Sequence, residues 1–118
     1  MKHITIADSE LPVMKALWRH GPLTSTQIME YVPGNKSTVK TLLQRLVAKG
    51  AVEAQRINLR ANRYTALISQ RQYTRRESTG FIDRLFDGSA RKMLMNFVQE
   101  EKITKEDIQR LLDMIEEE

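Results

Sequence analysis

The segment from Asn35 to Gly50 restricts the fold of this chain more than any other part of the sequence. Its large apolar residues recur at the spacing of one stripe on an amphipathic helix. These residues are Val39, Leu42, Leu43, Leu46 and Val47. The opposite face carries hydroxyl, amide, small and basic side chains, and the segment contains no Asp or Glu. Because such groups suit phosphates and base edges, the pattern predicts a helix that enters a DNA groove.

A short helix is predicted directly before this segment, over residues 25–32. Thr24 and Gln27 have the spacing of a capping box, and Leu23 and Ile28 have that of a hydrophobic staple. Two helices joined by a tight turn, of which the second is basic and free of acids, form a helix-turn-helix pattern.

The first helix is expected to follow a short lead over residues 1–7. Asp8 or Ser9 can cap it, and it runs through Arg19 until Gly21-Pro22 ends it. Its expected buried stripe consists of Leu11, Met14, Leu17 and Trp18, with Val13 beside it.

A β-hairpin is predicted after Gly50, where the period of the pattern changes to alternation. One strand starts at Val52, residues 59–62 can form the turn, and residues 63–67 form the return strand. This hairpin is the wing of a winged helix. Arg56, Arg60 and Arg63 cluster around its tip. Exposed arginines on a hairpin are commonly just solvated, but directly after a DNA-reading helix they favour contacts with phosphates.

Three more helices are predicted in the C-terminal half. They span residues 69–86, where Ser69 and Gln72 have capping-box spacing, residues 90–101, and the segment after a Thr104–Asp107 cap. Their apolar stripes are narrow, and so short a helical segment is marginally stable alone. We therefore divide the chain into a winged-helix DNA-binding domain (1–67) and a helical dimerisation domain (68–118). The alternative is that residues 68–118 fold back onto the N-terminal domain. The predicted interface residues are Tyr73, Phe81, Leu85, Leu94, Phe97, Leu111, Leu112 and Ile115.

The charge distribution supports this division. Residues 1–67 hold ten Lys/Arg and four Asp/Glu, a balance of +6, whereas residues 68–118 hold nine and eleven, a balance of −2. A basic N-terminal half is typical of a protein that binds a polyanion.

Several other classes of protein are disfavoured. The chain has no cysteine, so disulfides and thiolate metal sites are excluded, and His3 and His20 lack ligand spacing. We expect no cofactor. The absence of a long apolar run predicts a soluble, cytoplasmic protein without direct membrane insertion. No nucleophile motif, Gly-rich phosphate loop or paired-carboxylate helix is present, so we do not expect an enzyme.

The segment 36–50, preceded by 13–18, resembles the penicillinase-repressor family (the BlaI/MecI/CopY type). The resemblance covers nearly the whole chain and continues through residues 85–88 and 94–98. It implies a mainly α fold with a small β-hairpin wing, in a homodimeric winged-helix repressor that binds a palindromic operator in double-stranded DNA. It also implies contacts from the third helix and the wing. The implied DNA-binding residues are Ser37, Thr38, Lys40, Thr41, Arg45, Arg60 and Arg63.

The family differs internally in how repression is lifted. In the β-lactam branch a membrane sensor protease cuts an Asn-Phe bond, which Asn96-Phe97 matches. The copper branch binds metal through paired Cys-x-Cys motifs, which this chain cannot do, although its residues 38–43 also resemble that branch. Phe97 lies on the apolar stripe with Met93 and Leu94, so packing alone can explain its presence. A second alternative is a winged-helix protein-interaction module without sequence-specific DNA binding.

Overall fold

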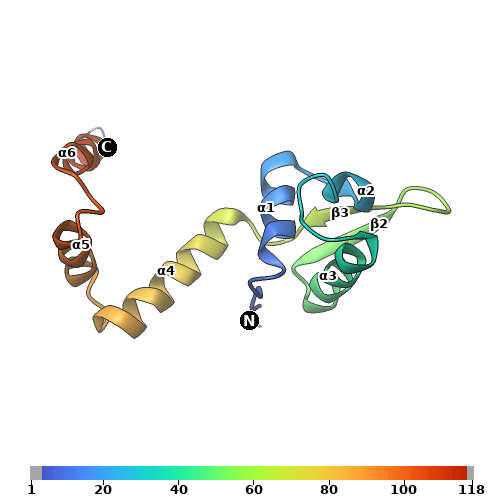
Figure 1. Cartoon of the computed structure of the whole chain (residues 1–118), viewed down its shortest axis with the longest axis horizontal. Helices are drawn as coiled ribbons and strands as arrows, with labels where there is room; N and C mark the ends of the chain where they lie inside the picture. The colour runs from blue at the N-terminus through green and yellow to red at the C-terminus, as the bar shows by residue number, and fades with distance from the viewer. Residues whose placement is uncertain (1–3, 117–118) are drawn as a thin grey trace. The chain divides into compact units, whose positions relative to one another are not determined.

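The computed structural model describes residues 4–116, and of the side chains after Arg110 it describes only that of Asp113. The chain forms two compact units, one up to Tyr73 and one from Thr74 onward. The first unit contains α1 (Leu11–His20), β1 (Leu23–Thr24), α2 (Ser25–Ile28), α3 (Lys36–Lys49), β2 (Val52–Arg56) and β3 (Asn62–Ala66). Then follow α4 (Gln70–Phe86), which begins in the first unit, α5 (Ala90–Gln99) and α6 (Lys105–Glu116) (Figure 1). The predicted mainly α fold with a small β-hairpin wing is confirmed.

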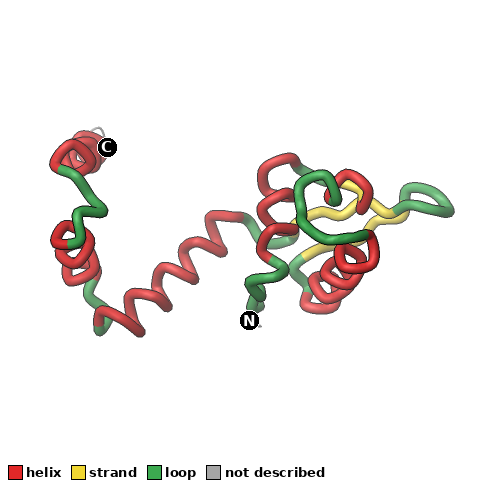
Figure 2. Tube along the Cα trace, in the orientation of Figure 1, coloured by secondary structure: helices red, strands yellow, loops and turns green. Residues whose placement is uncertain are grey.

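The first unit is built around a three-stranded antiparallel sheet with the strand order β1-β3-β2. In the predicted hairpin, Val52 pairs with Ala66 and Arg56 pairs with Asn62. The loop between these two strands projects from the sheet (Figure 2). The sequence did not predict β1, because Leu23 and Thr24 were interpreted only as the start of a helix. Both residues in fact pair with β3 as well.

The core of the first unit comes from α1, α2, α3 and the sheet, together with the segment before α1. Its buried hydrophobic residues are Ile6, Val13, Met14, Ala16, Leu17, Leu23, Ile28, Val32, Val39, Leu42, Leu43, Leu46, Ala51 and Val52. The predicted stripes are therefore largely confirmed. Val47, however, is 38% exposed, and Leu11 and Trp18 only pack against the margin of the core.

The helix ends in the first unit follow local side-chain rules with two corrections. The Thr24–Gln27 capping box and the left-handed cap at Gly50 (φ 83°) are confirmed. The prediction that Asp8 or Ser9 caps α1 was wrong. Glu10 is the residue before this helix, and its carboxylate instead accepts a hydrogen bond from the Ala7 N–H.

The second correction concerns α2, which ends at Ile28 instead of Val32. Beyond Ile28 the N–H groups of Glu30 and Tyr31 donate to the carbonyls of Gln27 and Ile28, three residues back. This tighter turn geometry breaks the α-helix before the chain reaches Pro33-Gly34.

The second unit consists of the rest of α4 followed by α5 and α6. The predicted Ser69–Gln72 cap of α4, in the first unit, and the Thr104–Asp107 cap of α6 are both confirmed by reciprocal hydrogen bonds. The helix α5 ends at Gln99, earlier than predicted, because Glu101 adopts a left-handed backbone conformation (φ 58°). Within residues 4–116, no helix is long and apolar enough to cross a membrane.

Candidate nucleic-acid interface

The N-terminal end of α3 is fixed by a side-chain cap. The Asn35 Oδ1 accepts hydrogen bonds from the Thr38 N–H (2.9 Å) and from the Thr38 hydroxyl (3.0 Å). One turn later, the Thr41 hydroxyl donates to the Ser37 carbonyl (3.0 Å). Both threonine hydroxyls therefore donate a hydrogen bond within α3 and its cap. Their oxygen lone pairs remain available to accept hydrogen bonds from a ligand.

The outer face of α3 is polar and contains no acidic side chain. Its inner face is buried through Val39, Leu43 and Leu46, which fixes the side that the helix presents to solvent. The predicted contact residues of this helix are all exposed. They are Ser37, Thr38, Lys40, Thr41 and Arg45.

The tip of the wing is held by its own hydrogen bonds. The Arg56 guanidinium donates to the carbonyls of Asn58 (3.3 Å) and Leu59 (3.4 Å). The Asn58 Oδ1 accepts a hydrogen bond from the Arg60 N–H (2.8 Å). These bonds shape the loop and leave Leu59 89% exposed at its tip.

A small cleft of about 210 Å³ lies between α3 and the wing. Four of its lining residues are cations, namely Lys36, Lys40, Arg56 and Arg60, and no acid lines it. The remaining lining residues are Ser25, Leu59, Ala61, Asn62 and Tyr64. Converging positive charges with hydroxyl and amide groups beside them make a site suited to an anion such as a backbone phosphate.

This cleft brings together some of the sequence-predicted contact residues and not others. It contains Lys40 and Arg60, whereas Arg63 is exposed elsewhere on β3. Lys36 was not among the predicted contact residues, although its place directly after the capping residue Asn35 puts it at the first position of the basic helix.

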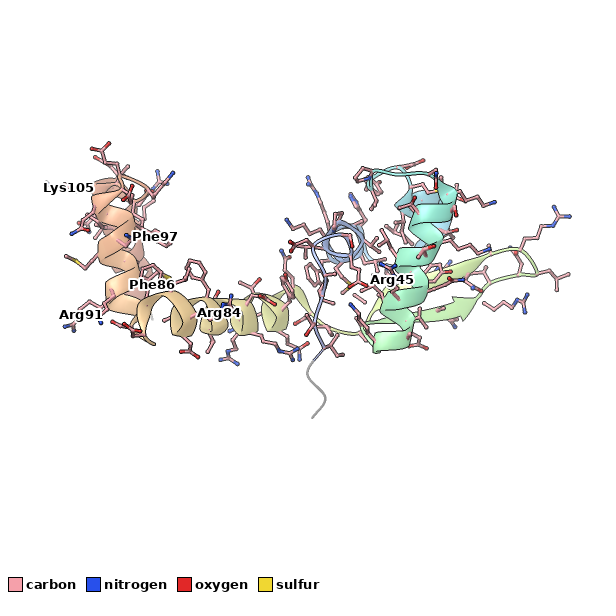
Figure 3. The ribbon with its side chains drawn as sticks, turned by 60° about the horizontal axis from the view of Figure 1, so that its bottom comes forward. Arg45, Arg84, Phe86, Arg91, Phe97 and Lys105 are labelled. Atoms are coloured by element: carbon pink, nitrogen blue, oxygen red, sulfur yellow. The ribbon has the colours of Figure 1, made fainter. Side chains whose placement is uncertain are left out.

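At its C-terminal end, α3 contacts an acidic residue, Glu10, which directly precedes α1. Burial of the Glu10 carboxyl raises its pKa, but the hydrogen bonds from Lys49 and Ala7 and the positive charges of Lys49 and Arg45 lower it more. The pKa of Glu10 therefore lies below its ordinary value. Figure 3 shows Arg45 on α3. Its side chain is exposed, and its positive charge contributes to the lowered pKa of Glu10.

In the second unit, the predicted interface residues form partly exposed apolar surface. The Phe86 ring lies 5.7 Å from that of Phe81 and 6.4 Å from that of Phe97, centroid to centroid (Figure 3). Leu85 and Leu94 are 62% and 44% exposed. Tyr73, also predicted as an interface residue, belongs to the first unit, where its ring packs on that of Trp18 with the centroids 5.4 Å apart. The side chains of Leu111, Leu112 and Ile115 lie outside the described residues.

The Asn96-Phe97 bond lies inside α5. Asn96 is exposed and Phe97 is half-buried. The carbonyls of Asn96 and Phe97 accept hydrogen bonds from the N–H groups of Glu100 (3.0 Å) and Lys102 (2.8 Å). No group of three or more His, Asp or Glu side chains in the described part of the chain could hold a metal ion.

Comparisons with known proteins identify the family and support the fold. The family model described as penicillinase repressor matches residues 6–117. The chain belongs to the penicillinase-repressor family. It is 29% identical to the penicillinase repressor of Bacillus licheniformis, over 95% of this chain and 90% of that protein. It is 25% identical to the methicillin resistance regulatory protein MecI of Staphylococcus aureus strain N315, over 97% of this chain and 95% of that protein.

Solved structures support the winged-helix fold of this member of the penicillinase-repressor family. The DNA-binding domain of the repressor BlaI, determined in solution, is 32% identical and has a TM-score of 0.53. The match covers 62% of this chain and 94% of that domain. The transcriptional regulator Tm0710 of Thermotoga maritima, at 19% identity and a TM-score of 0.51, shares the fold over 95% of this chain and 72% of that one.

Proposed function

We propose that this chain is a sequence-specific, DNA-binding transcriptional repressor that acts as a homodimer on a palindromic operator. The observation that carries the proposal is the acid-free outer face of α3, which adjoins a cleft lined by four cations at the wing. The names of its relatives, penicillinase repressor and methicillin resistance regulatory protein, support the same function.

In this proposal, α3 enters the major groove and reads base edges. The Thr38 and Thr41 hydroxyls already donate within the first unit, so they would accept hydrogen bonds from DNA. The donors in the major groove are the exocyclic amino groups of adenine and cytosine. We therefore expect the half-site to present adenine or cytosine amino groups opposite this face, while Ser37, Lys40 and Arg45 contact the remaining edges and phosphates.

The wing supplies affinity without reading sequence. A backbone phosphate bound in the cleft would meet the ammonium groups of Lys36 and Lys40 and the Arg60 guanidinium. Each phosphate neutralised in this way releases condensed counterions, which makes binding depend steeply on salt. Arg63, exposed on β3, would contact the backbone beside the cleft.

The second unit would join two copies, and its apolar surface supports this role. Leu85 and Leu94 are more than one-third exposed, and none of the described side chains of α4, α5 or α6 is buried. Contact with a second copy would remove this surface from water. Two joined chains would then read half-sites about 34–36 Å apart, or a multiple of that spacing. The bound dimer represses by covering the promoter, and this mechanism requires no catalysis.

The experiment that tests this function starts from a pool of randomised duplexes. We expect the wild-type chain to select a palindromic sequence. Thr41→Glu should abolish binding to that duplex, because a carboxylate would face the groove. The matched control is Thr79→Glu, since Thr79 is likewise exposed and its hydroxyl also donates to a carbonyl four residues back (3.0 Å to Arg75). Unchanged affinity of Thr41→Glu in a titration at fixed salt would contradict the assignment of α3.

Release by a sensor protease that cuts Asn96-Phe97 belongs to the same proposal. Cleavage there would separate α6 from α4 and so weaken the dimer. Because both carbonyls accept helical or capping hydrogen bonds, α5 must open locally before a protease can bind the bond in an extended form. Intact-mass measurements during induction by a β-lactam should find a fragment that ends at Asn96. A chain that stays uncut while repression is lifted would remove this part of the proposal.

The competing function is a winged-helix module that binds protein partners and no specific DNA. It predicts weak, salt-insensitive association with any duplex and no selected sequence. The cation-lined cleft favours the repressor, because a cleft of that charge predicts binding that weakens steeply with added salt.

A further inference from the structure

The segment before α1 is attached to the C-terminal end of α3. Ile6 is buried in the core, and Ile4 packs against it. The Thr5 carbonyl accepts a hydrogen bond from the ammonium group of Lys49 (2.9 Å). Since Lys49 is the last residue of α3, this hydrogen bond ties the segment to the end of the helix opposite to its Asn35 cap.

Glu10 is the centre of this attachment. It is only 1% exposed, and among the described residues it is the one charged or polar residue in the buried class. Its Oε1 accepts a hydrogen bond from the Ala7 N–H (2.8 Å) and forms an ion pair with Lys49. One carboxylate therefore joins the start of α1, the preceding segment and the end of α3.

A carboxylate at this depth has few alternative arrangements. A buried charge is costly unless it is paired and hydrogen-bonded, so α3 cannot move away from α1 at this end without leaving Glu10 unpaired. The buried stripe of α3 fixes which side of the helix faces solvent, and the ion pair adds a directional constraint on its last turn, because apolar attraction has no preferred direction whereas a charge-assisted hydrogen bond does. The ion pair is therefore well placed to refine where the outer face of α3 points.

We propose that Glu10 and Lys49 are positioning residues that set the orientation of α3, so that recognition of a specific DNA sequence depends on them more than general affinity for DNA does. This role rests on the proposed function. It differs from a phosphate contact by Lys49, which would raise the affinity for all duplexes alike and would contribute to the salt dependence of binding.

The test uses the full chain, the duplex selected by the wild-type protein and an unrelated duplex of equal length. The variants are Glu10→Gln, which retains an acceptor for the Ala7 N–H, Lys49→Met and the double variant. Lys15→Met, an exposed lysine on α1, is the control. We expect each single variant to bind the selected duplex about tenfold more weakly, which corresponds to about 1.4 kcal/mol, and the unrelated duplex less than about twofold more weakly. The double variant should bind the selected duplex no more weakly than the single variant with the lower affinity, because both changes break the same interaction.

The salt dependence separates positioning from phosphate contact. Lys49→Met should keep the wild-type slope of log affinity against log salt concentration, whereas Lys40→Met should reduce that slope by about 0.9. A reduced slope for Lys49→Met, with equal losses on both duplexes, would overturn the positioning role. Wild-type affinities in folded Glu10→Gln would overturn it as well.

A further variant keeps the test decisive if Glu10→Gln does not fold. Lys49→Arg changes the shape of the donor but retains the positive charge that pairs with Glu10. It should therefore restore most of the discrimination between the two duplexes that is lost in Lys49→Met. Failure of this rescue would count against an ion pair that orients the helix. If the wild-type chain itself selects no sequence, the proposed function fails first and the positioning role fails with it.

Discussion

The two compact units use similar amphipathic helices but bury them to different extents. In the first unit, the stripes of α1 and α3 pack with the sheet, and Met14 and Leu46 are fully buried. In the second unit, Leu85 is 62% exposed, and no described side chain is buried. An apolar stripe therefore specifies that a helix must pack but not against what. The first unit contains its own partner surfaces, while the second unit, in our proposal, obtains them from another copy of the chain.

The largest effect on the free energy of unfolding is expected for substitutions in the core of the first unit. Leu46→Ala removes a side chain with no exposed surface and should lower the free energy of unfolding by about 2–5 kcal/mol. Fluorescence of Trp18, the single tryptophan, reports on this unit, where its indole N–H donates to the Ile68 carbonyl (2.8 Å). The loss should be the same at every protein concentration. A midpoint that depends on concentration in this variant alone would mean that the core of the first unit is not self-contained.

The counterpart in the second unit is Leu94→Asp, which should act on association instead of folding. A charge on the α5 surface would have to be desolvated in a dimer, so the variant should sediment as a monomer. Because Leu94 is 44% exposed in the single chain, the unfolding transition seen by Trp18 should shift by less than about 0.5 kcal/mol. A Leu94→Asp variant that sediments like the wild type would move the interface away from α5.

The same contrast explains which parts of the fold could be predicted from the sequence. The caps at Thr24, Ser69 and Thr104 depend on residues three positions apart, so their spacing was sufficient. The strand β1 was missed because it forms only by pairing with β3, which lies far along the chain. The cap predicted at Asp8 or Ser9 failed for a similar reason, since the residue before α1 is Glu10, whose carboxylate pairs with Lys49 at the end of α3.

The candidate site shows the same limit at the level of side chains. Exposure of Ser37, Thr38 and Thr41 followed from the period of α3, but the use of the Thr38 hydroxyl by Asn35 required the folded geometry. Lys36 and Arg60 belong to different elements, and only the fold of the wing beside α3 places them in one cleft. Sequence periodicity assigns a residue to a face, whereas a binding cleft depends on how two faces meet.

The smallest expected effect is on the stability at low pH, and it again differs between the two units. The pKa of Glu10 is below its ordinary value, so the ionised carboxylate stabilises the first unit at neutral pH. That contribution is fully present above the unfolded-state pKa and is lost as the pH falls through the lower folded-state pKa. Between about pH 7 and about pH 3, Glu10→Gln should therefore show a smaller acid destabilisation by Trp18 fluorescence than Glu53→Gln, which removes an exposed acid from β2.

Asp107 provides the matching acid in the second unit. Its pKa is lowered mainly by the Thr104 N–H, which donates to its carboxylate (3.0 Å), and by the Thr104 hydroxyl. Protonation should loosen the first turn of α6, because the helix loses its cap and a negative charge at its N-terminal end. Asp107→Asn should accordingly reduce the acid-induced loss of helical circular dichroism and leave the Trp18 transition unchanged. If Asp107→Asn shifted the Trp18 transition as far as Glu10→Gln does, the two units would unfold in one cooperative transition. The difference in burial between them would then not make them unfold independently.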